Sequence, residues 1–183
     1  MARYELGAIY KIAGGEKTYY ARLLTDDVYG IFEPIFEEIC QKTFENAAYR
    51  LYISTGSFAV KRGFWEKILS SPDKTDVERW SRPPHLVRFT TWDIEGALER
   101  CLSFDQYGHT EVLEEEDYIA YLKQGFISII QPMYENIPSF LNRVYENWPQ
   151  SYICENVLNG TLGHQKRQIS ALKKIDFDVT PYE

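Results

Sequence analysis

The chain has 183 residues with 27 acidic and 20 basic side chains, a formal net charge of −7 and a pI near 5.1. A negative field of this kind repels phosphate backbones, and the basic side chains form no concentrated patch, so direct nucleic-acid binding is disfavoured. No stretch has the length and apolarity of a membrane span, and the N-terminus lacks the apolar core of a signal peptide. We therefore expect a cytoplasmic protein that does not contact the membrane.

Aromatic side chains are the unusual feature of the composition. There are 14 Tyr, 10 Phe and 4 Trp, which make up 15% of the chain. Most of them can be placed in a core, but Tyr and Trp are also favoured at protein interfaces. The aromatic excess and the acidic charge both suit a protein that binds a basic surface on another protein, although mild acidity also favours solubility alone.

Residues 6–33 predict an antiparallel meander of three short strands. Gly14 with Gly15, and then the stretch Thr25–Asp27, mark two tight reversals. Alternate side chains along each strand fall on one side of the pleat: Ala8, Tyr10 and Ile12, then Tyr19, Ala21 and Leu23, then Val28, Gly30 and Phe32.

The middle of the chain predicts shorter elements. Residues 34–47 are typical of a short helix, and residues 49–65 of a second hairpin whose second strand contains Phe58 and Val60. Residues 65–84 are polar and broken by prolines, which is typical of a loop with at most one helical turn. Residues 85–93 indicate another strand.

Helical patterns dominate the remainder of the chain. Residues 94–104 are compatible with a helix or a strand, and residues 108–115 are expected to be extended. Helices are predicted over residues 117–130, from Pro138 to Pro149, and over residues 163–175.

The order of elements predicts an α+β fold, with an antiparallel β-meander or barrel-like sheet in the N-terminal two thirds and helices in the C-terminal third. We expect a β-rich domain over residues 1–130, and a helical C-terminal extension over residues 131–183 packed on the same domain.

The chain shows no recognisable catalytic, metal or cofactor motif. Its three histidines are isolated from second ligands at metal spacing, its three cysteines form no CxxC pair, and "AGGEKT" lacks the spacing of a phosphate-binding loop. We therefore predict no catalytic residue, no metal and no cofactor. An enzyme that uses His85 or His109 as a general base beside a carboxylate stays open as an alternative.

The densest charge lies in the segment "EVLEEEDY". A run of this kind is common at the solvated start of a helix, but it also suits an acidic surface that meets a basic partner. Asp26 and Asp27, at a predicted hairpin tip, would extend this surface if the fold brought them together. The candidate partner-binding residues are thus Asp26, Asp27, Glu111, Glu114, Glu115, Glu116 and Asp117.

The order of motifs resembles the immunity protein 26 family of bacterial polymorphic toxin systems. The resemblance covers roughly residues 6–125, whereas residues 131–183 have no counterpart. It rests on "LGAIYKIAGGEKTYYARLL", on "SFAVKRGFWEKI" with a Gly-x-Trp feature from Gly63 to Trp65, on "RPPHLVRFTTWD" and on "TEVLEEEDYIAYL".

The resemblance implies an immunity protein of the contact-dependent inhibition type. Such a protein binds a cognate toxin domain, which in many such systems is a nuclease, and covers its active site or substrate surface without turnover. A third hypothesis is a small adaptor that binds a peptide along the exposed edge of a sheet.

Overall fold

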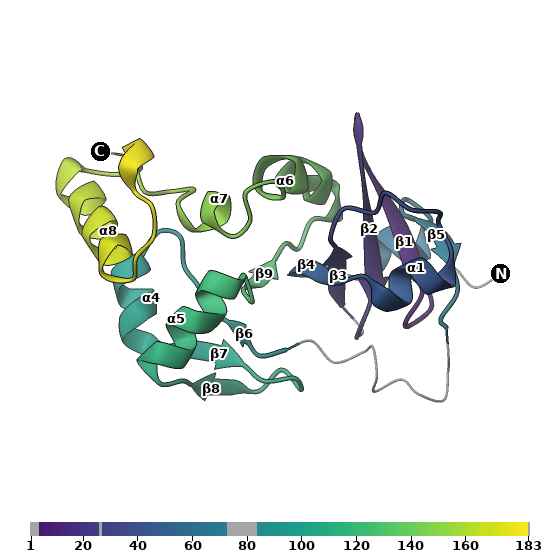
Figure 1. Cartoon of the computed structure of the whole chain (residues 1–183), viewed down its shortest axis with the longest axis horizontal. Coiled ribbons are helices and arrows are strands. Elements are labelled where there is room, and N and C mark those ends of the chain that lie inside the picture. The colour runs from purple at the N-terminus through teal and green to yellow at the C-terminus, as the bar shows by residue number, and fades with distance from the viewer. Residues whose placement is uncertain (1–3, 26, 73–83, 183) are drawn as a thin grey trace. The chain divides into compact units, whose positions relative to one another are not determined.

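The structure is a computed structural model that describes residues 4–25, 27–72 and 84–182. The strands are β1 (Ile9–Gly14), β2 (Lys17–Leu23), β3 (Val28–Phe32), β4 (Tyr49–Ser54), β5 (Glu66–Leu69), β6 (Leu86–Val87), β7 (Leu102–Phe104), β8 (Thr110–Val112) and β9 (Ser128–Ile130). The helices are α1 (Gln41–Asn46), α2 (Phe58–Lys61), α4 (Ile94–Arg100), α5 (Glu115–Gln124), α6 (Ile137–Val144), α7 (Gln150–Ile153) and α8 (Leu162–Lys174), with 3-10 helices η1 (Tyr134–Asn136) and η2 (Thr180–Tyr182). The predicted α+β class is confirmed, with strands concentrated early in the chain and helices late (Figure 1).

The chain divides into two compact units. Unit 1 consists of Met1–Pro83 and Ile129–Arg143, and unit 2 consists of Pro84–Ser128 and Val144–Glu183. The limits of the units do not coincide with the expected domain boundary at residue 130, because the chain returns to unit 1 through β9 and α6 before it enters unit 2 again. The expected division into folding domains at residues 1–130 and 131–183 stays a prediction.

Unit 1 is built on an open sheet of six strands in the order β5-β1-β2-β3-β4-β9. The strands from β5 to β4 pair antiparallel with their neighbours, as the meander of residues 6–33 predicts. Strands β5 and β9 form the two edges, and within the described part of the chain no ladder closes the sheet into a barrel.

The β1–β2 hairpin shows why its sequence alternates. Tyr10 lies opposite Ala21 and Ile12 opposite Tyr19, so the predicted apolar positions share one face. On that face, Asn142 of α6 donates to the Gly14 carbonyl at 2.9 Å and accepts from the Tyr19 hydroxyl at 2.7 Å. The helix and the hairpin of unit 1 are thereby held together by two hydrogen bonds.

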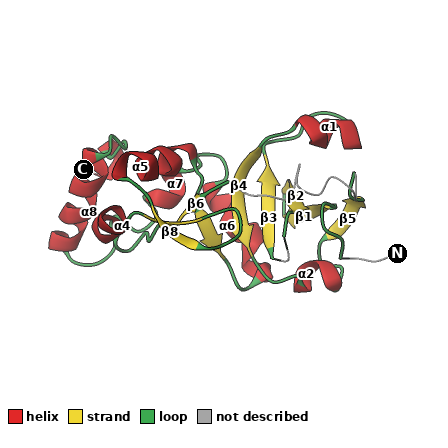
Figure 2. Ribbon diagram, turned by 90° about the horizontal axis from the view of Figure 1, so that it is seen from below, coloured by secondary structure: helices red, strands yellow, loops and turns green. Residues whose placement is uncertain are grey.

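Both faces of the central strands are covered, and Figure 2 shows α1 and α2 on opposite sides of them. On one face, Phe32 packs edge-on against Phe44 of α1 with ring centroids 4.8 Å apart. On the other face, Tyr29 packs edge-on against Trp65, which follows α2, at 5.1 Å. Large aromatic side chains therefore fill both layers of unit 1.

Unit 2 combines a three-stranded sheet, in the order β6-β7-β8, with α4, α5, α7 and α8. Gln168 of α8 is buried and accepts a hydrogen bond from the Ile94 amide at 2.7 Å, which satisfies a donor at the start of α4. The Tyr118 hydroxyl of α5 donates to the Arg88 carbonyl at 2.7 Å. The first contact joins two helices and the second joins a helix to the segment after β6, so both connect parts of unit 2 that are far apart in the sequence.

Three sequence-based expectations are wrong in detail. The predicted strand with Phe58 and Val60 is the short helix α2, in which the Lys61 amide donates to the Ser57 carbonyl and the Arg62 amide to the Phe58 carbonyl. The first residues of the predicted loop 65–84 include strand β5, which pairs with β1 at the sheet edge; residues 73–83 lie outside the described part. The predicted helix 117–130 ends earlier, at the left-handed Gly125, and β9 follows.

Among the helices described, none has the length and apolarity needed to cross a membrane.

Candidate functional site

The two units differ sharply in charge. Unit 1 carries 13 acidic and 13 basic side chains, whereas unit 2 carries 14 acidic and seven basic side chains. The net charge of −7 therefore belongs to unit 2. Residues 84–128 alone hold nine acidic and three basic side chains.

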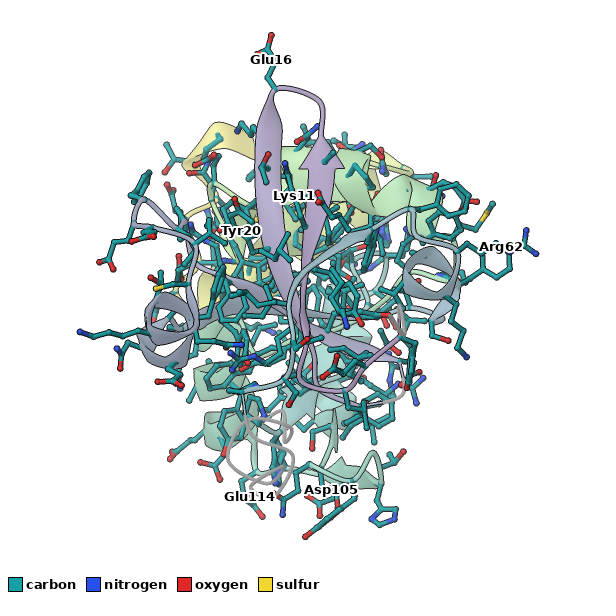
Figure 3. The ribbon with its side chains drawn as sticks, turned by 90° about the vertical axis from the view of Figure 1, so that its right-hand side faces the viewer. Lys11, Glu16, Tyr20, Arg62, Asp105 and Glu114 are labelled. Carbon is teal, nitrogen blue, oxygen red and sulfur yellow. The ribbon has the colours of Figure 1, made fainter. Side chains whose placement is uncertain are left out.

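Five carboxylates of unit 2 lie together on consecutive elements, and we call them the acidic band. All five side chains are exposed. Figure 3 shows Glu114 at the margin of unit 2. The acidic band consists of Glu111 on β8, Glu114 before α5, and Glu115, Glu116 and Asp117 in the first turn of α5.

Other carboxylates of unit 2 have structural tasks that the acidic band lacks. Asp105 accepts hydrogen bonds from the amides of Tyr107 and His109, both at 2.8 Å, and so holds the β7–β8 turn. Asp93 accepts from the Gly96 amide at 3.1 Å and caps α4. Among the described residues, the side chains of Glu114–Asp117 make no hydrogen bond or ion pair, so their charge is directed to solvent.

The helix dipole explains only part of the acidic band. Acidic side chains in the first turn of α5 are stabilised by the amides at the helix N-terminus. Glu111, however, lies on a strand and not in the first turn of a helix. Its neighbour Val112 is 74% exposed, and Tyr107 in the adjoining turn is 62% exposed. The surface around the acidic band thus combines charge with apolar side chains in contact with water.

The histidines contact carboxylates, but on an exposed surface. His85 Nδ1 lies 3.5 Å from Glu111 Oε2, and His109 Nδ1 lies 3.1 Å from Asp105 Oδ2. Three of these four side chains are between 38% and 77% exposed, Asp105 being the exception. Within the described ranges, no group of three His, Cys, Asp or Glu side chains could hold a metal ion.

A surface hollow of about 520 Å³ lies beside α1 in unit 1. It contains Cys40, whose pKa is lowered by hydrogen bonds from the side chain and backbone of Thr43. Glu33, Glu37 and Glu38 also line it, and its described lining contains no histidine that could serve as a base. The hollow therefore lacks the paired nucleophile and base of a thiol enzyme.

Of the two aspartates of the predicted hairpin tip, the structure describes only Asp27, and it belongs to a different unit from the acidic band. Asp27 belongs to unit 1, at the β2–β3 connection, where its side chain accepts a hydrogen bond from Ser54 Oγ at 2.9 Å. Asp26 lies outside the described residues. Of the seven candidate residues, the structure brings five together within one unit.

A second exposed cluster, which the sequence analysis missed, lies in unit 1. Tyr134 of η1 stacks on Phe64 at 5.1 Å and contacts Phe58 of α2 at 5.9 Å. The Arg62 guanidinium lies 4.2 Å from the Phe58 ring centroid, and Figure 3 shows Arg62 pointing outward. Phe64 is 61% exposed. The only signal in the sequence is the excess of aromatic residues, because these side chains are distant along the chain.

Comparison with known proteins gives no further assignment, since no family model, no curated protein and no solved structure matches this chain.

Proposed function

We propose that this protein is an immunity protein, which binds a cognate bacterial toxin domain and covers its active site or substrate surface. The observation that carries the proposal is the acidic band, in which five neighbouring carboxylates are exposed and four have no partner among the described residues. The protein acts stoichiometrically in the cytoplasm: once bound, it occupies the toxin surface that the toxin's substrate would otherwise contact.

The acidic band can attract a basic surface on the toxin through complementary charge. A nuclease toxin needs a basic cleft to hold phosphates, and a surface of carboxylates matches such a cleft. Complementary charge raises the association rate and disfavours partners of the same sign. Because unit 1 is electrically neutral, the field that steers the partner originates in unit 2.

The apolar neighbours of the acidic band supply the contact area that charge alone lacks. Exposed ion pairs contribute at most about 1 kcal/mol each, whereas buried aromatic side chains dominate interface energies. Tyr107 and Val112 are exposed on the β7–β8 hairpin, within the same part of unit 2. An interface centred on this hairpin would bury both while the carboxylates meet basic groups.

Co-expression tests the proposal directly. The product of the gene immediately upstream, which the proposal expects to contain the toxin domain, is expressed with the wild-type protein or with the Glu115→Lys, Glu116→Lys variant. We expect survival with the wild type and loss of protection with the variant. The matched control is Glu37→Lys, Glu38→Lys in unit 1, which makes the same charge change at two exposed positions and keeps protection.

Circular dichroism and thermal unfolding check that both variants are folded. Cells that die equally fast with and without the wild-type protein would overturn the proposal. Equal protection by both reversed variants would show that the acidic band is only the solvated start of α5.

The enzyme alternative is separated from binding by its stoichiometry. His85→Ala removes the ring that lies beside Glu111 while leaving the acidic band in place. A binding inhibitor keeps protection in this variant and protects in proportion to its amount. Loss of protection in His85→Ala, with unchanged affinity for the toxin, would instead favour catalysis.

A further inference from the structure

Strand β8 is an edge strand of the small sheet in unit 2, and no other strand of the described residues pairs with its outer side. It pairs with β7 on one side only, and Figure 1 shows it on the outside of the unit. All three of its side chains are exposed, unlike those of any other strand of that sheet. An edge of this kind presents backbone donors and acceptors that another strand can use.

The register identifies which backbone groups face outward. The Asp105 amide donates to the His109 carbonyl at 2.9 Å, and the Leu113 amide donates to the Cys101 carbonyl, also at 2.9 Å. Bonded and non-bonded pairs alternate along an antiparallel ladder, so Glu111 is bonded to its partner on β7. Thr110 and Val112 therefore direct their N–H and C=O groups away from β7, and neither has a partner among the described residues.

We propose that the edge of β8 receives an extended basic segment of the partner, which pairs through the main-chain groups of Thr110 and Val112. This inference rests on the proposed function for the partner's identity and specifies how that partner is held. Main-chain pairing supplies affinity, and the alternating side chains of β8 supply specificity.

Charge selects a basic strand over a second copy of this chain. A second β8 would bring another Glu111 and a second acidic band against the first, and like charges across a strand pair are destabilising. A partner strand with Lys or Arg toward Glu111 and apolar side chains toward Val112 matches both faces of β8. The expected partner sequence thus alternates basic and β-branched residues.

A peptide pair tests the main-chain pairing without the toxin. The probe is a fluorescein-labelled octapeptide of four Lys-Val repeats, titrated into the full-length protein and followed by anisotropy. A version with every backbone amide N-methylated keeps the charge but cannot donate hydrogen bonds from either edge of the peptide, and a Glu-Val version reverses the charge. We expect binding weaker by about tenfold or more for the N-methylated peptide, and no binding of the Glu-Val peptide at the same concentrations.

Hydrogen exchange locates the contact. Bound Lys-Val peptide is expected to slow exchange of the Thr110 and Val112 amides and to leave the Glu111 amide unchanged. Equal affinity for the methylated and unmethylated peptides, or unchanged exchange at both outward amides, would overturn the inference and leave the acidic band acting through side-chain charge alone.

Two substitutions at one position carry the test to the toxin. Val112→Pro removes an outward N–H that makes no bond within the sheet, whereas Val112→Thr keeps the N–H and the shape. We expect Val112→Pro to lose peptide binding by about tenfold or more and to lose protection, and Val112→Thr to stay within about twofold of the wild type. If Val112→Pro does not fold, the peptide pair and the exchange measurement still decide.

The two proposals fail in distinguishable ways. If the Lys-Val peptide binds the edge of β8 but the protein gives no protection, the proposed immunity function is wrong and the proposed strand site is supported. If a folded Val112→Pro variant protects fully, the proposed immunity function is supported and the proposed strand site is wrong.

Discussion

The two units of this protein use charged and aromatic residues in opposite ways. Unit 1 has no net charge, and it encloses Tyr29, Phe32 and Phe44 between a six-stranded sheet and the segments that cover it. Unit 2 has a smaller sheet and the whole net charge of −7, much of it on one strand and one helix turn. Solubility alone would be served by charge spread over both units, so the concentration in unit 2 supports a role in recognition.

The contrast extends to how each unit treats a single charge. In unit 1, Arg22 is only 4% exposed and lies among aromatic rings, with no carboxylate at ion-pair distance among the described residues. In unit 2, the carboxylates of the acidic band are exposed, and Glu114–Asp117 have no partner among the described residues. Unit 1 thus shields a charge from water within its packing, whereas unit 2 presents charge to water.

The largest expected effect concerns the end of α5 in unit 2. Gly125 has φ +80°, and a Cβ there would collide with Trp148, whose Nε1 donates to the Gly125 carbonyl at 3.2 Å. Gly125→Ala therefore combines backbone strain with overpacking, and we expect the free energy of unfolding to fall by about 3 kcal/mol. Urea unfolding followed by circular dichroism measures it.

Gly163→Ala is the matched control for that change. Gly163 lies in α8, and a Cβ there would meet nothing within 4 Å. Alanine favours a helix over glycine, so we expect this variant to be stabilised by up to about 1 kcal/mol. Similar destabilisation by both alanines would contradict the assigned role of Trp148.

The second effect is the buried hydroxyl of Tyr118. Tyr118→Phe removes its bond to the Arg88 carbonyl and leaves that carbonyl without this donor, which we expect to lower the free energy of unfolding by about 1.5 kcal/mol at pH 7. Burial raises the pKa of Tyr118 above its ordinary value. The neutral form is thus favoured in the folded state, so its stabilisation is present below about pH 10 and is lost as the pH rises further.

Chemical unfolding at several pH values from 7 to 11 checks this sign. The wild type should lose stability more steeply than Tyr118→Phe above about pH 10. Parallel curves for the two proteins would show that Tyr118 ionises as freely in the folded state as in the unfolded chain.

The sequence predicts the meander well because its signals are local. Gly15, at φ +80°, provides the reversal between β1 and β2, and the alternation of apolar residues sets the register. Strand β5 was missed because only its pairing with β1 makes it a strand. The helix predicted over residues 117–130 was too long because its apolar spacing continued past Gly125, whose left-handed conformation ends α5.

The candidate site was predicted where it is continuous in sequence. Glu111 and Glu114–Asp117 follow one another along the chain, so the fold only had to expose them. The aromatic cluster around Tyr134 was beyond reach, because Phe58 and Phe64 approach it only after η1 returns to unit 1. The outward direction of Thr110 and Val112 likewise depends on the register with β7, which spacing alone does not give.

The third effect tests the buried charge of unit 1. Arg22 donates to the Tyr49 hydroxyl at 3.3 Å and to the Phe44 carbonyl at 3.5 Å, and its Nε has no hydrogen-bond partner in the described ranges. The free-energy cost of burying the charged guanidinium is larger than the stabilisation from its two long hydrogen bonds. We therefore expect Arg22→Met to raise the free energy of unfolding by about 1 kcal/mol. Tyr49→Phe, which removes an acceptor and keeps the charge, should lower it by a similar amount.

Urea unfolding of both variants measures the opposite signs. Destabilisation by Arg22→Met comparable to that of Tyr49→Phe would show that the aromatic surroundings and the two acceptors fully compensate for the lost hydration of the guanidinium.

The smallest expected effect on stability separates local contact from the field of the whole protein. Asp27→Lys in unit 1 and Glu116→Lys in unit 2 change the net charge equally. Asp27 is exposed and loses one hydrogen bond from Ser54, so its substitution should alter the free energy of unfolding by less than about 0.5 kcal/mol. We expect Asp27→Lys to keep toxin protection and Glu116→Lys to weaken it. If both variants weakened protection equally at low salt and neither did so at high salt, the net charge of the whole protein would explain the effect. Salt screens long-range electrostatic attraction first and leaves contacts within an interface largely intact.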